Sequence, residues 1–234
     1  MEILYQDEDL VAVNKPSGML VHRGWANDKV VAMTELRDQI DQWVYPVHRL
    51  DRGASGVLVF ALSSEMAASL GASFMERQVQ KHYLALVRGV PEPEGLIDHD
   101  IPKKAGGPKV SAQTEYRRLG VSGRYSLVEV LPRTGRLHQI RKHMKHISCP
   151  LIGDVRYGKG EHNRHFRDNY NLHRLALHSH GLAVAHPRSG EPLELRAPLP
   201  PDLASTLLAL AIIEDTGELR ANFDLSAPSQ STSS

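Results

Sequence analysis

The sequence predicts an α+β fold built on a mixed or mostly antiparallel sheet. Candidate strands are grouped into hairpins, and candidate helices lie between these groups rather than after each strand, which argues against repeating βαβ units. Of the 234 residues, 41% are hydrophobic and 24% are charged. A chain of this length and composition can bury one large core or two closely packed halves, and disorder is excluded for most of it.

Over the first half of the chain, periodicity and capping signals define each expected element. The run 57–61 is continuously apolar and predicts a buried strand, whereas apolar residues at helical spacing predict a helix over 30–43. Ser63 can cap the helix that follows it, and Pro16 and Gly18 fix a bend before the first helix. The expected elements are strands at 3–5, 10–14, 57–61 and 81–87 and helices at 30–43 and 64–77.

The second half is expected to contain paired strands separated by polar loops. Four apolar residues recur at helical spacing and predict a helix whose stripe faces the core. They are Leu137, Ile140, Met144 and Ile147. The expected elements are a loop at 91–108, strands at 110–119 and 125–131, the helix just described, a loop at 158–171, strands at 174–185 and 193–197 joined by a turn at 187–190, a helix at 203–213 capped by Asp202, and a disordered tail at 226–234.

Asp51 is the candidate nucleophile. It lies in the segment HRLDRGASG at 48–56, between two arginines and just before the apolar run at 57–61, so it sits on a tight turn that leads directly into the core. The alternative is that its side chain only stabilises this turn, as aspartates before glycines commonly do.

Tyr83 is the second candidate. In KHYLALV at 81–87, alternation places Tyr83, Ala85 and Val87 on one face of a strand. A tyrosine at such a position can equally be part of the core, with its ring buried and its hydroxyl at an edge.

Arg141 is the third candidate, because it flanks or joins the apolar stripe of its helix. A buried arginine needs an anion, since leaving the charge unpaired costs roughly 3–5 kcal/mol by analogy with broken buried ion pairs. Asp51 is the expected partner. An ordinary solvated helix face is the alternative.

These segments resemble the signature motifs of the RluA-type pseudouridine synthases. HRLDRGASG is similar to the family's HRLDxxTSG, KHYLALV to its KxY motif, and TGRLHQIRKH at 134–143 to TGRxHQ[LI]RxH. KPSGMLVH at 15–22 is similar to KPxGxxVH. Ala54 stands where the family usually has threonine, a change in the turn rather than at the carboxylate.

The resemblance implies one catalytic domain, at 1–225, made of two similar subdomains around a bent sheet with an RNA-binding cleft between them. Because the KPSG motif already begins at Lys15, no S4-like RNA-binding module is expected before it. Specificity is therefore expected to reside in the catalytic domain and its loops.

The resemblance also implies the reaction and the role of each candidate. Asp51 would act as nucleophile or base, Arg141 would pair with it and keep it ionised, and Tyr83 would pack against the target uracil. Conversion of uridine to pseudouridine exchanges an N1–C1′ bond for a C5–C1′ bond without redox change, so no cofactor is expected. Attack at C1′ and attack at C6 both remain open.

A base in a helical RNA must leave its stack to reach such a site. Arg52 could intercalate in its place, because guanidinium planes stack on bases; a surface ion pair or a phosphate contact is the alternative. The net charge of +1 is uninformative, but no acidic residue lies between Glu129 and Asp154. The expected RNA contacts are Arg49, Arg52, Lys81, Arg133, Arg136, His138, Lys142 and Lys145, of which the lysines could instead be solvated surface charges.

Metals and nucleotide cofactors are not expected. The chain has no HExxH, GxGxxG or GxxxxGK[ST], and the single Cys149 supplies neither a disulfide nor the cysteine pair of a zinc deaminase. The pairs His178 with His180, on one strand face, and His162 with His165, in a polar loop, are attributed to chance proximity. Cys149 is expected to be buried.

The acidic start of the chain and the lack of an apolar run of membrane length predict a cytoplasmic protein without membrane association. The segments 3–24 and 173–193 resemble a subgroup that modifies a T-stem uridine, position 65 of tRNA, so tRNA is the expected partner of a monomer. A related synthase acting on ribosomal RNA is one alternative. A catalytically silent RNA-binding or RNA-folding protein is the other.

Overall fold

The computed structural model describes residues 1–23, 30–103 and 106–215, so the tail expected at 226–234 lies outside the described residues. The strands are β1 (Glu2–Gln6), β2 (Leu10–Lys15), β3 (Tyr45–Pro46), β4 (Ser55–Ala61), β5 (Gln80–Arg88), β6 (Glu94–Asp98), β7 (Ile101–Pro102), β8 (Lys109–Val110), β9 (Gln113–Ser122), β10 (Tyr125–Pro132), β11 (Leu177–Ala185) and β12 (Pro192–Arg196). The helices are α1 (Ala32–Ile40), α2 (Ser64–Met75), α3 (Gln139–His146), α4 (Gly160–Tyr170) and α5 (Pro201–Ala209).

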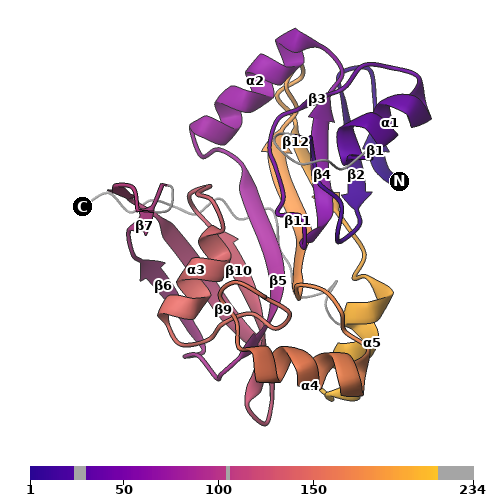
Figure 1. Cartoon of the computed structure of the whole chain (residues 1–234). Coiled ribbons are helices and arrows are strands. Elements are labelled where there is room, and N and C mark those ends of the chain that lie inside the picture. Colours follow the sequence, from indigo (N-terminus) through magenta and orange to yellow (C-terminus); the bar gives the residue numbers. More distant parts are fainter. Residues whose placement is uncertain (24–29, 104–105, 216–234) are drawn as a thin grey trace.

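One large mixed sheet runs through the described part of the chain (Figure 1). Its strand order is β1-β2-β4-β11-β5-β10-β9-β6, with β12 beside β11 and β3 beside β4, while β7 and β8 form a separate hairpin. The β4–β11 pair is parallel and the other described pairs are antiparallel. This confirms the predicted α+β class. Because β11 comes from the C-terminal part of the chain yet lies between β4 and β5, it joins the two halves of the sheet.

The helices cover both faces of this sheet, and the alternation of strand residues decides which side chains they meet. Tyr83, Ala85 and Val87 share one core cluster with residues of α1 and α3, as predicted for one strand face. Leu84 and Leu86 point the other way and pack with residues of α4 and α5. On β4, the residues that face away from the α1 side pack with α2. Thus α1 and α3 pack on the face that carries Tyr83, α4 and α5 pack on the opposite face of β5, and α2 packs on the face of β4 that points away from α1.

Capping confirms one predicted helix start and corrects another. The Ser63 hydroxyl accepts a hydrogen bond from the Met66 amide at 3.2 Å, so α2 begins as predicted. The last helix begins earlier than predicted, with Pro200 as its N-cap, and Asp202 lies inside its first turn. Pro201 occupies the first helical position, where proline is well suited because the first helical amides have no partner within the helix. The first helix is shorter than predicted and ends where Asp41 adopts a left-handed conformation.

Two segments predicted as loops contain regular structure. The segment 91–108 includes β6, which pairs with β9 at the edge of the sheet, and β7. The segment 158–171 forms α4, whose buried residues are His162, Asn163 and Phe166. Their packing against the sheet stabilises a helix that the polar composition concealed.

The predicted apolar stripe of α3 is also shorter than expected. Ile140 and Met144 are buried in the core and Ile147 packs against it. Leu137 is 44% exposed, because the helix begins only at Gln139 and His138 has a left-handed backbone conformation. Among the described residues, no helix combines the length and apolarity needed to cross a membrane.

Candidate active site

The turn that carries Asp51 is held by the bend at the end of β2. The Gly18 amide donates to the carbonyl of Arg52 at 2.8 Å, and the Ser17 hydroxyl donates to the carbonyl of Gly53 at 2.7 Å. The Lys15 side chain is fully buried beneath these residues. The KPSG segment, predicted only as a bend, therefore supports the Asp51 turn.

Lys15 satisfies backbone acceptors on both segments. Its ammonium donates to the carbonyls of Pro16 and Met19 at 2.8 Å each and to that of Arg52 at 3.4 Å. Burial, together with the charge of Arg174, lowers the pKa of Lys15 to about 7. The conformation of the turn is thus stabilised from below by a side chain with no access to solvent.

The ion pair predicted between Asp51 and Arg141 is present. Arg141 Nη1 donates to Asp51 Oδ2 at 3.0 Å, and the Asp51 side chain is 21% exposed, so its carboxylate remains accessible. Burial disfavours the charge on Arg141, but hydrogen bonds to two carboxylates raise its pKa above the usual value. Arg141 is therefore a permanent cation next to Asp51.

The second carboxylate belongs to Asp154, which sequence reasoning did not select. Arg141 donates to Asp154 through Nε at 2.7 Å and Nη2 at 2.9 Å. The absence of acidic residues after Glu129 makes Asp154 the first acid in the chain beyond Arg141, which is the one signal that could have found it.

Helix α3 is fixed against β9 by its polar residues, which places Arg141. Gln139 donates to the carbonyl of Gln113 and to Thr114 Oγ1, each at 2.9 Å, and accepts from the Thr134 hydroxyl at 2.6 Å. The His143 ring contacts the same Thr114 hydroxyl at 2.8 Å. The glutamine and histidine of HQIRKH are thus structural, and they orient the helix face that carries Arg141.

Tyr83 lies in β5 with its ring in the core and its side chain lining the same cavity as Asp51. Burial, opposed by a hydrogen bond with the Ser179 side chain, raises the pKa of Tyr83 to about 12. The phenol is therefore protonated at physiological pH, so it can donate a hydrogen bond or pack against a base.

A cavity of about 720 Å³ lies above these residues. Cavities of this size commonly hold small ligands, and this one brings together residues from both halves of the sheet. Its lining includes Asp51, Tyr83 and Arg141 together with Arg49, Lys81, Arg133, Arg136 and His138 from the predicted RNA contacts. The cavity therefore places the Asp51 carboxylate among several basic side chains.

Three predicted RNA contacts do not line this cavity. Arg52 is exposed, and its Nε donates to the carbonyl of Gly18 at 3.0 Å. Lys142 donates to the carbonyl of Pro102 at 3.3 Å, beside the β7–β8 hairpin. Lys145 is exposed near the ring of Tyr157. All three side chains lie outside the cavity, where they can contact the phosphate backbone of an RNA but not its target base.

His138 approaches Asp51 from the start of α3. Its Nε2 lies 3.9 Å from Asp51 Oδ1, while its Nδ1 is 3.1 Å from the hydroxyl of Tyr157. Burial lowers the pKa of His138; Asp51 opposes this effect, and nearby Arg141 adds to it. A neutral imidazole is therefore favoured at this edge of the cavity.

The histidine pairs singled out in the sequence have structural contacts. His178 Nδ1 lies 2.8 Å from the Ser55 hydroxyl, and the rings of His178 and His180 are 6.0 Å apart. His162 Nδ1 lies 2.9 Å from the Tyr125 hydroxyl. Cys149 is buried, as predicted.

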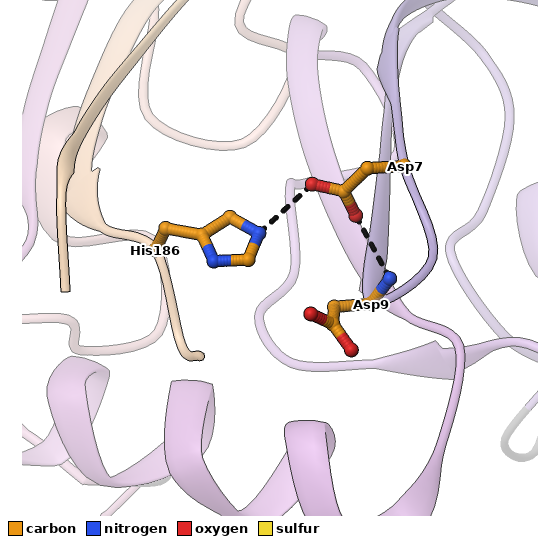
Figure 2. A group of neighbouring side chains, drawn as sticks. All are labelled: Asp7, Asp9 and His186. Carbon is orange, nitrogen blue, oxygen red and sulfur yellow. Dashed lines mark hydrogen bonds and ion pairs between the residues drawn. The ribbon is translucent and has the colours of Figure 1, made fainter. Parts of the chain in front are cut away.

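Within residues 1–23, 30–103 and 106–215, one group of three potential metal ligands comes together, and it lies outside the cavity: Asp7, Asp9 and His186 (Figure 2). His186 Nε2 lies 2.8 Å from Asp7 Oδ2, and Asp7 Oδ1 accepts from the Asp9 amide at 2.8 Å. Arg188 donates to both oxygens of Asp9. Because a fixed guanidinium already neutralises Asp9, these residues form an ion-pair network that ties the β1–β2 turn to the β11–β12 turn.

A comparison with protein families identifies the chain. The sequence profile of the RNA pseudouridylate synthase family matches residues 9–146, more than half of the chain. The chain belongs to this family. RNA pseudouridylate synthases are isomerases, and the matched residues include Asp51, Tyr83 and Arg141.

Individual relatives extend the match beyond the family profile. A protein named tRNA pseudouridine synthase C from Pectobacterium carotovorum is 48% identical over 84% of this chain, which spans 58% of that relative's length. A protein of the same name from Vibrio parahaemolyticus is 44% identical over 84% of this chain and 89% of the relative.

Solved structures of the family share the fold. The structure titled Human RNA Pseudouridylate Synthase Domain Containing 4 superposes with a TM-score of 0.75 at 27% identity, over 92% of this chain and 94% of that chain. Human RNA Pseudouridylate Synthase Domain Containing 1 gives a TM-score of 0.73 at 27% identity, over 88% of this chain and 86% of that one.

Proposed function

We propose that this RNA pseudouridine synthase isomerises a uridine of tRNA, at position 65 of the T stem, with Asp51 as its nucleophile. The observation that carries the proposal is the Asp51 carboxylate, which is partly exposed in a basic cavity and ion-paired with Arg141 at 3.0 Å. The names of the bacterial relatives support tRNA as the substrate.

The geometry suits a reaction that needs one carboxylate and no external electron donor. Asp51 attacks the target nucleotide and forms a bond to it, the N1–C1′ bond breaks, and the base turns. C5 then joins C1′, the bond to Asp51 breaks, the C5 proton is lost and N1 regains a proton. Tyr83, whose pKa burial raises to about 12, holds the base as a neutral phenol during this rotation. Arg141 stabilises the negative charge of Asp51 between turnovers.

The basic residues that line the cavity supply the affinity for RNA. Arg49, Arg133 and Arg136 are exposed at the rim of the cavity, where phosphates of a flipped nucleotide and its neighbours would lie, and Lys81 is partly buried in the lining. The enzyme is expected to act as a monomer, with Asp51, Tyr83 and Arg141 supplied by the same chain. A tRNA substrate would place it in the cytoplasm.

The test uses tRNA transcripts with tritium at uracil C5. The wild type should release tritium without added cofactor, and Asp51→Asn, which keeps the size of the side chain, should release none while binding tRNA with a similar Kd. A transcript with cytidine at position 65 should release one equivalent of tritium less per tRNA molecule. Release from the Asp51→Asn variant at the wild-type rate would reject this nucleophile.

The same assay separates the other substrates. Release from ribosomal RNA fragments but not from tRNA would make the enzyme a ribosomal RNA synthase. Tight binding of both RNAs without release from either would make the chain an RNA-binding protein.

A further inference from the structure

Asp154 is a buried carboxylate directly behind the Asp51–Arg141 pair, and it lies beyond the residues that the family profile matches. Its side chain is 0% exposed, that of Arg141 is 11% exposed and that of Asp51 is 21% exposed. The three residues thus form a line from the interior to the cavity, with the guanidinium in the middle.

The contacts divide the donors of Arg141 between the two acids. Nε and Nη2 form a bidentate pair with Asp154, at 2.7 and 2.9 Å, and Nη1 is left for Asp51 at 3.0 Å. A bidentate pair fixes the plane of a guanidinium as well as its position. Asp154 therefore determines the direction in which the remaining donor points.

The turn that carries Asp154 is itself rigid. Asn163 of α4 accepts from the Gly153 amide at 2.8 Å and donates to the carbonyl of Asp154 at 3.0 Å. Gly153 has a φ of +75°, and a Cβ on it would lie 1.8 Å from the carbonyl oxygen of Arg174, so only glycine fits there. Helix α4, predicted as a loop, thus supports the site through this turn.

The electrostatics agree with the geometry. Burial alone would raise the pKa of the Asp154 carboxyl, but hydrogen bonds from Arg141 and from the amides of Tyr157 and Arg156 hold it below its usual value. Asp154 is therefore ionised when Arg141 is in place, and it offsets the cost of burying the guanidinium.

We propose that Asp154 is a positioning residue for the isomerisation, holding the Arg141 guanidinium so that Nη1 faces Asp51 at the cavity. The inference rests on the proposed function for the reaction that Asp154 serves. Without Asp154, Arg141 regains rotational freedom, and small displacements of a catalytic group can cost up to about a hundredfold in rate.

Asp154 also accepts the amides of Arg156 and Tyr157 through Oδ1, each at 2.9 Å, so a merely structural role in its turn must be separated from positioning. Asp154→Asn makes this separation. The asparagine oxygen can still accept both amides, whereas its NH₂ group faces the Arg141 Nε–H, and two donors cannot bond.

Kinetics provide the first measurement. With tritiated tRNA under single-turnover conditions, Asp154→Asn should lower the rate constant at least about tenfold and change the Kd for tRNA less than about twofold. Asp9→Asn is the matched control, because Asp9 is also buried and also pairs with an arginine through two donors, but away from the cavity. It should lower Tm without changing the rate.

A double-mutant cycle with Arg141→Met then tests whether Asp154 acts through Arg141. In the Arg141→Met background, Asp154→Asn should change the rate less than about twofold, and it should raise Tm because it removes an unpaired buried charge. In the wild-type background it should lower Tm.

The outcomes are distinct. A wild-type rate for Asp154→Asn, or rate losses that multiply in the double variant, would overturn the positioning role. Failure of the wild type to release tritium from any RNA would instead reject the proposed function. The Tm cycle would still report whether Asp154 and Arg141 are coupled, and additive Tm changes would count against the proposal.

Discussion

Gly56 of β4 lies directly against the backbone of Ser179 in β11. A Cβ atom on Gly56 would lie 2.1 Å from the Ser179 carbonyl oxygen, and the φ of Gly56 is +109°. Ser179 is also in register with Tyr83 of β5. One close backbone contact thus sets the strand that follows the Asp51 turn at a fixed distance from the strand that carries Tyr83, which explains the final glycine of HRLDRGASG by packing.

Gly56→Ala should therefore destabilise the fold by at least about 2 kcal/mol, because it adds a steric clash to an unfavourable φ. Urea unfolding measures this loss. Gly190→Ala is the control: its φ is +73° but nothing lies within 4 Å of the added Cβ, so it should cost only about 1 kcal/mol. Equal losses in the two variants would show that contact with Ser179 is not the reason for glycine at position 56.

The residues of the candidate site could be named from the sequence because the motifs that carry the resemblance are short and local. Asp51 lies just before an apolar run, and alternation predicted that Tyr83 shares one strand face with Ala85 and Val87, while the resemblance implied that Asp51 and Tyr83 lie in one site. The partner of Arg141 followed from the cost of a buried charge. Each inference combined a short segment, one physical rule and the resemblance of that segment to a family motif.

Helix α4 could not be predicted in this way. Its buried face consists of His162, Asn163 and Phe166, so its periodicity is mostly polar and gives no hydrophobic stripe. The contacts that stabilise it come from the tertiary structure, such as that between His162 and the Tyr125 hydroxyl of β10. Intrinsic helix propensity gives little information when contacts with residues distant in the sequence decide whether a helix forms.

Asp154 was missed for a related reason. It lies 13 residues after Arg141 and follows no helical or strand spacing from it. The cost of a buried charge predicts one anion for Arg141, but one guanidinium can bind two carboxylates, so this rule leaves the second carboxylate unassigned.

The raised pKa of Tyr83 predicts a specific dependence of stability on alkaline pH. The unfolded chain loses the phenolic proton near pH 10, whereas the folded chain keeps it to about pH 12. The folded state therefore binds more protons in this window, and stability falls as pH rises through it. Between pH 9 and pH 11 this effect should lower the free energy of unfolding of the wild type by roughly 1 kcal/mol. Tyr83→Phe should not show this part of the loss.

Urea unfolding of wild type and Tyr83→Phe at pH 9 and pH 11 provides the measurement, and the difference between the two proteins isolates this tyrosine. Tyr125→Phe serves as a comparison away from the cavity: burial also raises the pKa of the Tyr125 phenol, so this variant should likewise lose a part of the alkaline dependence. If Tyr83→Phe and the wild type lose the same stability, the phenol of Tyr83 is not protected by burial.

The buried His178 predicts a loss of stability as the pH falls. Burial, together with the neighbouring His180, lowers the pKa of His178 to about 3. The unfolded chain binds this proton near pH 6.5, so it binds more protons than the folded chain between pH 6.5 and 3, and stability falls as pH decreases through this window. The loss should be roughly 2 kcal/mol at pH 5 relative to pH 7.

His178→Gln should lose this part of the dependence, because glutamine can still contact the Ser55 hydroxyl but does not titrate. His173→Gln is the control, since His173 is exposed and its variant should follow the wild-type curve. Urea midpoints at pH 7 and pH 5 measure both. A His178→Gln curve parallel to the wild type would mean that another group causes the acid sensitivity.

The basic rim of the cavity predicts a change in the salt dependence of RNA binding. Arg49 and Arg136 are exposed and line the cavity, so each is expected to contact one phosphate. A protein that neutralises phosphates releases counterions, and the slope of log K against log salt falls by about one for each contact removed. Arg49→Gln and Arg136→Gln should each weaken tRNA binding and reduce the slope by about one.

Arg37→Gln supplies the matched comparison, because Arg37 pairs with Asp38 on α1 and does not line the cavity. Its variant should keep both the wild-type Kd and the wild-type slope. If all three variants weaken binding equally, the RNA follows a broad surface rather than the rim of the cavity. If Arg49→Gln and Arg136→Gln change the Kd without changing the slope, these arginines contact bases instead of phosphates, because a base contact releases no counterion.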